Sequence, residues 1–413
     1  MLSLPKTTFD TFNLIMKRKL NVIPLLIISI LFFLLNWYVL SGIEVVANTP
    51  STPLFFWTII AFSTALLIYS ISRIQTTGMG MLFKIATHFF LILFASELLF
   101  VALLFLEDVY HYISGRPRNV NWIIFDLFAT ILLIATFIYG MVRGKYAYRV
   151  IKHTLYFEDL PSSFDGFTIS QISDVHSGSF TDAKAVQKGI DMIIAQRSDV
   201  FVFTGDLVNN KAEEIKPWIE MFSKIKAPFG QFSILGNHDY GDYVTWESPQ
   251  KKDQNLNNLK KYHADMGYRL LLDEHIELQK GNDKIILAGV ENWGIGFGER
   301  GDLKKALSGT NDADFKILLS HDPSHWEAEV IKHHSKVHLT LAGHTHGMQF
   351  GIEALGIKWS PVKYRYKHWA GIKSLKGMYL NINRGFGFIG FSGRVGIWPE
   401  ITVIELKRKE GTS

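Results

Sequence analysis

The stretch HLTLAGHTHG, residues 338–347, joins an apolar run to two histidines. HLTLA (338–342) is the near-continuous kind of run expected for a β-strand that is covered on both faces. His344 and His346 follow it, and residues two apart in an extended chain point to the same side of the backbone. Taken alone, the segment fits either a metal-binding pair of histidines or an ordinary turn.

The same theme recurs through residues 151–413. Short β-type runs alternate with stretches of helical pattern, for example 182–196 and 212–225. This alternation favours an α/β domain in which sheet is buried between layers of helices. The β-type runs are FTISQIS (167–173), VFVF (200–203), FSIL (232–235), KIILAGV (284–290), FKILLS (315–320), HLTLA (338–342) and MYLNI (378–382).

Polar residues follow five of these runs at the point where each strand is expected to end. A single cluster of this kind is usually turn or helix-cap chemistry. Open α/β sheets, however, bind ligands at the carboxyl ends of their strands, so five clusters in one domain are expected to converge on a site. The clusters are Asp174 with His176, Gly205 with Asp206, Gly236 with Asn237, His238 and Asp239, His321 with Asp322, and His344 with His346.

The composition limits what such a site can hold. The chain has no cysteine, which excludes disulfides and thiolate metal sites. A transition metal would have to be bound by His, Asp, Glu or Asn, a ligand set that suits Mn, Fe, Zn or Co.

Residues 1–150 form a region of a different kind. Four apolar runs, at about 22–40, 54–72, 85–106 and 122–142, are long enough to cross a bilayer and carry aromatic residues near their ends. Their length and number disfavour buried helices of a soluble protein. A cleaved signal peptide is disfavoured because the first run is long and no small-residue cleavage site follows it. We therefore predict a transmembrane region at 1–150 and a second domain at 151–413.

The charges indicate an orientation. Residues 1–150 contain 11 Lys and Arg against 6 Asp and Glu, and the remainder contains 32 of each, so the net charge of +5 belongs to the apolar region. That distribution disfavours a nucleic-acid-binding protein and suits a membrane anchor. By the positive-inside rule, the N-terminal tail (Lys6, Lys17, Arg18, Lys19) and the exit at 143–152 are cytoplasmic, although Arg116 and Arg118 in the third loop oppose this. We predict a multi-pass cell (inner) membrane protein whose second domain faces the cytoplasm.

Two carboxylates lie within the predicted spans. Glu97 and Asp126 are costly in hydrocarbon, so both are expected to face the interior of the helix bundle. They fit either a transport or proton-relay role or a simple helix-association role.

In their order along the chain, Asp174-x-His176, Gly205-Asp206, Gly236-Asn237-His238-Asp239, His321 and Gly343-His344-x-His346 resemble the signature of the calcineurin-like metallophosphoesterases. The resemblance covers about residues 167–406. The ending, with Asn383, Arg384, Arg394 and the run 398–401, is similar to the membrane-anchored bacterial branch of that superfamily. The resemblance to the metallophosphoesterases implies a four-layer α/β/β/α sandwich with two divalent metal ions at the strand ends.

The resemblance also implies a role for each motif residue. The first metal would take Asp174, His176 and His346, the second Asn237, His321 and His344, and Asp206 would bridge both. Water activated between two such ions would attack the phosphorus centre. We assign protonation of the leaving group to His238, with Asp239 orienting its ring.

Other positions receive structural interpretations or depart from the branch. His325, His333, His334 and His338 lie off the motif, and we expect structural roles for them. Met348 stands where the branch more often has glycine, and Asn209 where an acidic residue is common. Neither is an expected ligand, so these departures concern the fit of the substrate rather than metal binding.

The stretch KWSPVKYRYKHWAGIKSLKG (358–377) mixes basic and aromatic residues. It fits an anionic membrane surface or a phosphorylated lipid head group, the stacking of nucleobases, or an ordinary solvated loop. The leading hypothesis is a phosphoesterase that cleaves a phosphodiester or pyrophosphate bond in a membrane lipid or its nucleotide-linked precursor. The alternatives are a soluble nucleotide or cyclic nucleotide as substrate, and a transporter or sensor with a metal-binding regulatory domain.

Overall fold

The computed structural model describes residues 22–73, 81–354 and 356–409. The chain divides into two compact units, Met1–Ala135 and Thr136–Ser413, which we call the membrane unit and the C-terminal unit. The division falls within a helix, whereas the sequence places the boundary at 150. The basic residues of the N-terminal tail, on which part of the predicted orientation rests, lie outside the described residues.

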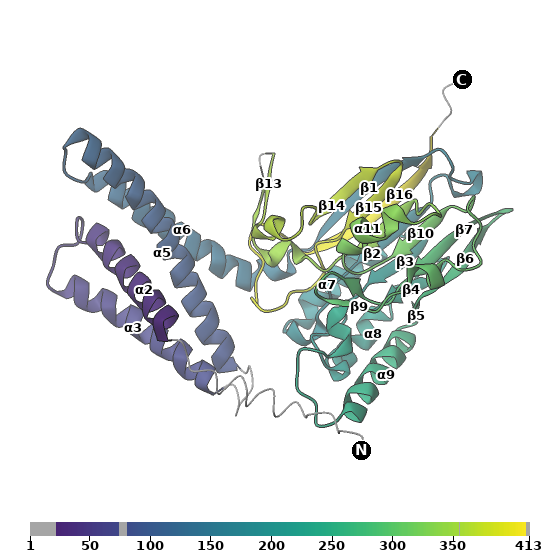
Figure 1. Ribbon diagram of the computed structural model, residues 1–413, viewed down its shortest axis with the longest axis horizontal. Coiled ribbons are helices and arrows are strands. Elements are labelled where there is room, and N and C mark those ends of the chain that lie inside the picture. The colour runs from purple at the N-terminus through teal and green to yellow at the C-terminus, as the bar shows by residue number, and fades with distance from the viewer. Residues whose placement is uncertain (1–21, 74–80, 355, 410–413) are drawn as a thin grey trace, which may run out of the picture. The chain divides into compact units, whose positions relative to one another are not determined.

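Four long helices account for the predicted spans (Figure 1). They are α2 (Val22–Ile43), α3 (Ser51–Ser72), α5 (Met81–Ser114) and α6 (Val120–Val142). Each is long and apolar enough to cross a membrane. Large apolar side chains such as Leu31 and Phe128 are exposed on them, as contact with lipid requires. The helix α5 extends well past the predicted 85–106.

The interior of the membrane unit contains an apolar cluster of Val39, Phe100, Leu104 and Ile123. Glu97 and Asp126 are also buried, at 8% and 0% exposure, as the sequence predicted. No hydrogen bond or ion pair described for this unit joins the two carboxylates.

An ion pair ties the end of α5 to the loop before α6. Arg118 donates from Nε and Nη2 to the two carboxylate oxygens of Asp108, at 2.6 and 2.7 Å. The Tyr38 hydroxyl donates to Asp108 at 2.7 Å, and Arg118 also reaches the Ser41 carbonyl at 2.9 Å. Arg118 therefore links three parts of the bundle and has a structural partner for its charge.

The C-terminal unit is built on two six-stranded sheets. The first runs in the order β1 (Arg149–Phe157), β16 (Glu400–Arg408), β2 (Thr168–Ile172), β3 (Val200–Thr204), β4 (Gln231–Ile234), β5 (Arg269–Leu270). The second runs in the order β14 (Gly371–Leu375), β15 (Met378–Ile382), β11 (Leu339–Ala342), β10 (Lys316–Leu319), β7 (Asp283–Gly289), β6 (Glu274–Lys280). Two small antiparallel pairs, β8 (Trp293–Gly294) with β9 (Gly298–Glu299) and β12 (Ile352–Ala354) with β13 (Ile357–Trp359), lie outside both sheets.

The central strands are parallel. In the first sheet β2, β3 and β4 pair in parallel, and in the second β7, β10, β11 and β15 do so. Every residue of β3, β10 and β11 is buried, which explains why these strands are almost continuously apolar. The charged exception is Lys316 at the start of β10, whose ammonium donates to the Asp314 carbonyl at 3.1 Å. Parallel pairing brings the carboxyl ends of neighbouring strands to one edge, where the polar clusters follow.

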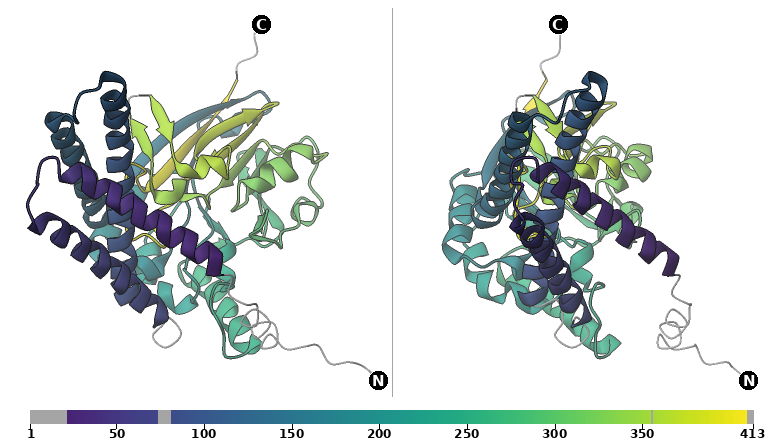
Figure 2. Two further views of the ribbon diagram at one scale, coloured as in Figure 1. Left: turned by 60° about the vertical axis from the view of Figure 1, so that its left-hand side comes forward. Right: turned by 90° about the vertical axis from the view of Figure 1, so that its left-hand side faces the viewer.

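Three apolar cores make four layers. One core lies between the sheets and joins residues such as Val202 and Ile404 to Leu319 and Leu341. A second lies between the first sheet and α7 (Ala183–Ile194), α8 (Ile219–Phe222) and α9 (Pro249–Asp265). The third lies between the second sheet and α10 (Leu303–Ala306) and α11 (Ser324–Ala328). The predicted α/β/β/α sandwich is confirmed, and Figure 2 shows α9 at the outside of the unit in both views.

Local sequence explains where the helices begin and end. Asp182 caps α7 by accepting the N–H of Ala185 at 3.0 Å. The predicted helix at 212–225 is instead a 3₁₀ helix (Ala212–Trp218) followed by the short α8, because Pro217 interrupts it. Strands β1 and β16, which pair in parallel over nine residues, are not among the predicted β-type runs.

Candidate metal centre

All seven predicted ligands come together at the carboxyl ends of five strands. Asp174 and His176 follow β2, and Asp206 follows β3. Asn237 follows β4, His321 follows β10, and His344 and His346 follow β11. Six of these residues are buried and His344 is partly buried, with 8% of its side chain exposed, so little water competes for the donor atoms.

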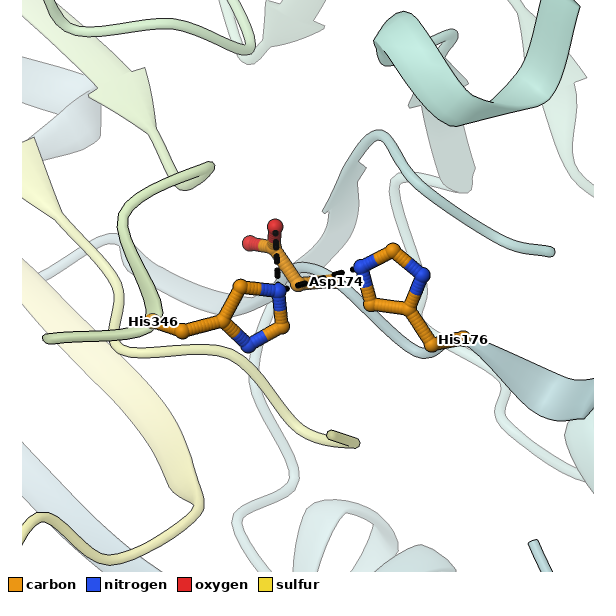
Figure 3. A group of neighbouring side chains, drawn as sticks. All are labelled: Asp174, His176 and His346. Atoms are coloured by element: carbon orange, nitrogen blue, oxygen red, sulfur yellow. Dashed lines mark hydrogen bonds and ion pairs between the residues drawn. The ribbon is translucent and has the colours of Figure 1, made fainter. Parts of the chain in front are cut away.

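The first group consists of Asp174, His176 and His346, whose candidate ligand atoms lie within 4.8 Å of one another. Nε2 of His346 is 3.2 Å from a carboxylate oxygen of Asp174 and 3.0 Å from Nε2 of His176. Figure 3 shows a single ring nitrogen of His346 facing both neighbours. The three donors therefore point at one common position.

The second group consists of Asp206, His321 and His344, again within 4.8 Å. Asn237 joins it, because its Oδ1 lies 3.0 Å from Nδ1 of His344. The same His344 nitrogen is 3.3 Å from Nε2 of His321. The ligand set expected for the second metal is thus assembled around one point.

Asp206 lies between the two groups. Its Oδ2 is 3.2 Å from Nε2 of His321 and 3.5 Å from Nε2 of His176. Its Oδ1 accepts the backbone N–H of His238 at 2.9 Å, which fixes the carboxylate plane. This is the position required of a carboxylate shared by two ions.

Hydrogen bonds on the far side of the rings determine which nitrogen is free to bind. Nδ1 of His321 is 2.7 Å from the Thr204 carbonyl, so Nδ1 carries the proton and Nε2 presents its lone pair to the site. His344 has the reverse arrangement, with Nε2 3.4 Å from the carboxylate of Asp322 and Nδ1 in the site. Nitrogen and oxygen donors oriented in this way fit divalent ions of the Mn, Fe, Zn or Co type.

The charges of the site are strongly coupled. Burial opposes ionisation of Asp206, but His321 and His238 hold the pKa of that carboxyl well below its usual value. Burial likewise lowers the pKa of His176 and of His344. His321 behaves differently: burial acts to lower its pKa, yet the carboxylates of Asp206 and Asp174 raise it to about 10. In the absence of metal, a proton on His321 therefore balances part of the carboxylate charge.

The backbone is strained at the ligands. Asp174, His176, Asp206, His344 and His346 all have positive φ, between 46° and 70°. Left-handed backbone costs a non-glycine residue about 1–2 kcal/mol, and such strain concentrates at functional sites. Glycines make the close approach possible: a Cβ at Gly343 would lie 1.8 Å from Oγ of Ser173, and one at Gly236 would lie 2.2 Å from Oδ1 of Asp206.

The contacts of His238 correct one expectation. Its Nδ1 is 2.8 Å from the backbone carbonyl of Asn209, and its ring lies 4.9 Å from that of His176. Asp239 does not orient the ring. The Asp239 carboxylate instead accepts the backbone N–H groups of Gly236, Asp206, Leu207 and Val208 at 2.8–3.2 Å. It supports the loops after β3 and β4, and the Asn209 carbonyl takes the role that we had expected for Asp239.

Two residues of the site were not assigned a role from the sequence. Asp322 is fully buried behind His344 and also accepts the Tyr366 hydroxyl at 3.0 Å. Arg394 is fully buried and reaches Nδ1 of His346 at 3.2 Å. The signal for Asp322 was its position next to His321. Arg394 is 48 residues from His346, and only the resemblance of the chain's ending drew attention to it.

Three of the off-motif histidines have hydrogen-bond partners outside the metal centre, as their expected structural roles require. His325 contacts the Ser320 hydroxyl at 2.8 Å, and His338 contacts the Asp159 carboxylate at 2.8 Å. His333 lies 3.2 Å from the Ser335 carbonyl.

Comparison with known proteins agrees with this geometry. Residues 167–348 match the family described as calcineurin-like phosphoesterase, and residues 19–145 match the one described as probable calcineurin-like phosphoesterase, transmembrane domain. A Bacillus subtilis (strain 168) protein, the uncharacterized metallophosphoesterase YkuE, is 31% identical over 273 residues, covering 65% of this chain and 90% of that protein. An uncharacterized metallophosphoesterase of Aquifex aeolicus (strain VF5) is 29% identical over 268 residues, covering 64% and 94%.

A Danio rerio transmembrane protein with metallophosphoesterase domain is 26% identical over 291 residues, covering 68% of this chain but only 62% of that protein. The chain therefore spans less than two thirds of this relative.

Together, the four-layer fold, the two converging ligand groups and the apolar helices define a membrane-associated, metal-dependent phosphoesterase. The chain belongs to the calcineurin-like metallophosphoesterases.

Proposed function

We propose that this enzyme uses two divalent ions to hydrolyse a phosphodiester or pyrophosphate bond in a membrane lipid or a nucleotide-linked lipid precursor, at the cytoplasmic face. The observation that carries the two-ion proposal is the position of Asp206, whose Oδ2 lies within 3.5 Å of ring nitrogens from both ligand groups. Two ions, when bound, supply the Lewis acidity and the water activation that phosphoester hydrolysis requires.

His238 is the proposed proton donor to the leaving group. Its ring lies beside the first ligand group without belonging to either. The Asn209 carbonyl accepts a hydrogen bond from Nδ1–H, which leaves Nε2 available to pass a proton to a departing oxygen. Tyr243 packs on the same ring, with centroids 4.5 Å apart, and limits its rotation.

The surroundings of the second group support an anionic substrate. Phe297 and Tyr366 pack around His344, with ring centroids 4.5 and 5.6 Å from it. Beside Tyr366 a cavity of about 170 Å³ opens, and its wall has three basic residues, Arg365, Lys367 and His368, against one acidic residue, Glu327. A pyrophosphate or a nucleotide-linked lipid has further negative charge at some distance from the bond that is cleaved. Basic groups near the metal centre would bind that charge.

The segment 358–377 supports a membrane surface better than nucleobase stacking. Trp369 is buried, and its carbonyl accepts the Thr345 hydroxyl at 2.7 Å, so this ring is unavailable for stacking. Tyr364, by contrast, is 79% exposed next to Lys363. A tyrosine beside a lysine is a combination found at bilayer interfaces.

The cytoplasmic orientation rests on charge. Arg143, Lys145 and Arg149 follow α6, where the chain leaves the predicted span. Arg118, which opposed this orientation in the sequence, is held in an ion pair with Asp108. Four spans also return the chain to the side on which it began.

The test is a substrate panel on the purified full-length chain in detergent, with metal content measured on the same samples. Lipid-linked diesters and pyrophosphates should be hydrolysed faster than soluble nucleotides and cyclic nucleotides, and each chain should bind two metal ions. His238→Ala should abolish most turnover, while His334→Ala, an exposed histidine outside the site, serves as the matched control. A large preference for soluble diesters would favour the nucleotide alternative. Unchanged turnover in His238→Ala, together with loss of cellular function in Glu97→Ala, would favour the sensor or transporter.

A further inference from the structure

The small antiparallel pair β12–β13 forms a hairpin that stands out from the C-terminal unit (Figure 1). Directly opposite residues of such a pair share a face, and here Ile352 pairs with Trp359 and Ala354 with Ile357. Ile352, Ala354, Ile357 and Trp359 therefore lie on one face. The other face has the pair Glu353 and Lys358.

The polar face of the hairpin is turned toward its own domain. Glu353 forms an ion pair with Arg384, and Lys358 donates to the Ala370 carbonyl at 2.6 Å while lying over the Trp369 ring. The apolar face is consequently turned outward, with Ile352 51% and Ile357 57% exposed. This is the reverse of the usual arrangement, in which the apolar face of a hairpin covers the core.

Exposed apolar side chains are concentrated around this hairpin. From residue 149 to 409, the described part of the chain contains nine large apolar side chains that are exposed. Four of the nine lie between 348 and 364: Met348, Ile352, Ile357 and Tyr364. A gathering of this kind marks a surface that contacts another apolar phase or a partner.

The contacts at the base of the hairpin indicate what its apolar face meets, because these residues pack against the end of α6. Phe350 stacks on Phe137 of α6 with centroids 5.5 Å apart and rings within 5° of parallel. Phe391 packs edge-on against the same ring at 6.0 Å, and the backbone N–H of Gly351 donates to the Val395 carbonyl at 2.9 Å. Arg394, next to Val395, donates its backbone N–H to Gly140 of α6 at 3.2 Å. The base of the hairpin thus lies against the last turns of a helix that is long and apolar enough to span the bilayer.

We infer that the β12–β13 hairpin is a second membrane contact of this enzyme, with its Ile352–Ile357 face in the interfacial layer of the bilayer that holds α6. An amphipathic element at the interface buries its apolar face about 5–10 Å deep, and basic and tyrosine side chains beside it remain among the head groups. Lys363 and Tyr364 follow the hairpin closely in the chain, with the Lys363 ammonium 5.3 Å from the Tyr364 ring centroid, and would take that role. The contact holds whatever the substrate is. It also brings Met348, two residues after the metal-site residue His346, next to the lipid surface.

The absence of cysteine in the natural chain allows a direct test. Single cysteines at Ile352 and Ile357 would carry an environment-sensitive fluorophore in protein reconstituted into nanodiscs, with nitroxide groups on the lipid chains as quenchers. Ile194 and Leu375, each 40% exposed on the same unit, serve as matched controls, and Phe128 in α6 serves as the positive control. All five sites are at least 40% exposed, so labelling should not disturb the core.

Labels at 352 and 357 should be quenched about twofold or more by the nitroxide lipids, as at 128, whereas labels at 194 and 375 should not. If labels at 352 and 357 match those at 194 and 375, the inference is overturned. It is also overturned if they are shielded from a water-soluble quencher without responding to nitroxide lipids, because a protein partner would then cover the face. The readout is independent of turnover, so a wrong assignment of the substrate would leave it unaffected.

Discussion

Nη2 of Arg394 lies 3.2 Å from Nδ1 of His346, on the side of the ring opposite to the first ligand group. The same guanidinium donates to the carbonyls of Arg384 at 2.8 Å and Gly387 at 2.6 Å. Its backbone N–H donates to Gly140 near the end of α6. A single buried arginine thus touches a metal-site residue, the loop after β15 and the end of a transmembrane helix.

Replacing Arg394 with glutamine should weaken binding at the first metal site about 10–100-fold, because the guanidinium donates to the carbonyls of Arg384 and Gly387 and so holds in place the loop that packs behind His346. A guanidinium can only donate, so it does not accept the proton that Nδ1 of His346 carries when Nε2 binds metal. Metal titration of the detergent-solubilised protein would measure this, with binding at the second site expected to remain. Arg269→Gln, on an exposed arginine, is the control. Equal loss at both sites with a lower melting temperature would mean that Arg394 acts only on folding.

Metal uptake should release protons. His321 has a pKa of about 10 in the metal-free site and binds metal only as the neutral ring, so at pH 7–8 it must give up a proton. Affinity should therefore rise about tenfold per pH unit between pH 7 and 9. Calorimetric titration in two buffers of different ionisation enthalpy measures the release. No proton released at pH 7.5 would contradict the charge balance described for the site.

Substitutions of His238 and Asp239 should have different effects, the first on the catalytic rate and the second on the stability of the fold. His238→Ala should lower kcat about 10²–10⁴-fold for substrates with poor leaving groups and much less for p-nitrophenyl esters, with metal content unchanged. Asp239→Asn should lower stability by about 1–3 kcal/mol, because its carboxylate accepts four backbone N–H groups. Leaving-group dependence and thermal melting distinguish the two. If Asp239→Asn changed the dependence of kcat on the leaving group without changing stability, Asp239 would act in the proton transfer after all.

His263 should make the fold sensitive to acid. Complete burial lowers the pKa of His263 to about 3, and its Nδ1 lies 2.9 Å from the Ser233 hydroxyl. The unfolded chain binds a proton on this histidine near pH 6.5, whereas the folded chain binds it only near pH 3. The free energy of unfolding is therefore unaffected by this group above pH 6.5 and falls as the pH is lowered from 6.5 toward 3. At pH 5 the loss is about 2 kcal/mol. Melting temperatures at pH 8 and pH 5 should therefore differ less in His263→Gln than in the natural protein, and an equal difference in both would contradict the assignment.

Replacing Met348 with glycine should make the folded protein more stable. Its φ is 48°, it follows Gly347 in left-handed backbone, and its side chain is 57% exposed. Relief of left-handed strain, about 1–2 kcal/mol, exceeds the entropic cost of an added glycine, about 0.4–1 kcal/mol. The melting temperature of Met348→Gly should rise, whereas Leu375→Gly, in a strand with ordinary φ, should lower it. A fall in both variants would show that the Met348 side chain makes stabilising contacts that outweigh the strain.

The local sequence was sufficient for the elements whose signal is local. Four spans followed from the length of apolar runs, and β3 and β11 followed from runs that are apolar on both faces. The convergence of Asp174 with Asp206, and of His321 with His344, followed from one physical fact, that parallel strands end at the same edge of a sheet. The meeting of the two pairs depends on how the two sheets pack together.

The tertiary structure decided what depends on side-chain direction and on contacts between distant segments. Local propensity does not encode where the Asp239 carboxylate points, so only the fold showed that it holds backbone N–H groups while the Asn209 carbonyl holds His238. The contact of Arg394 with His346 and that of Phe350 with Phe137 join residues far apart in the chain, which only the packed fold brings together. The outward apolar face of β12–β13 depends on its register and on the ion pair of Glu353 with Arg384, neither of which the spacing of residues can fix.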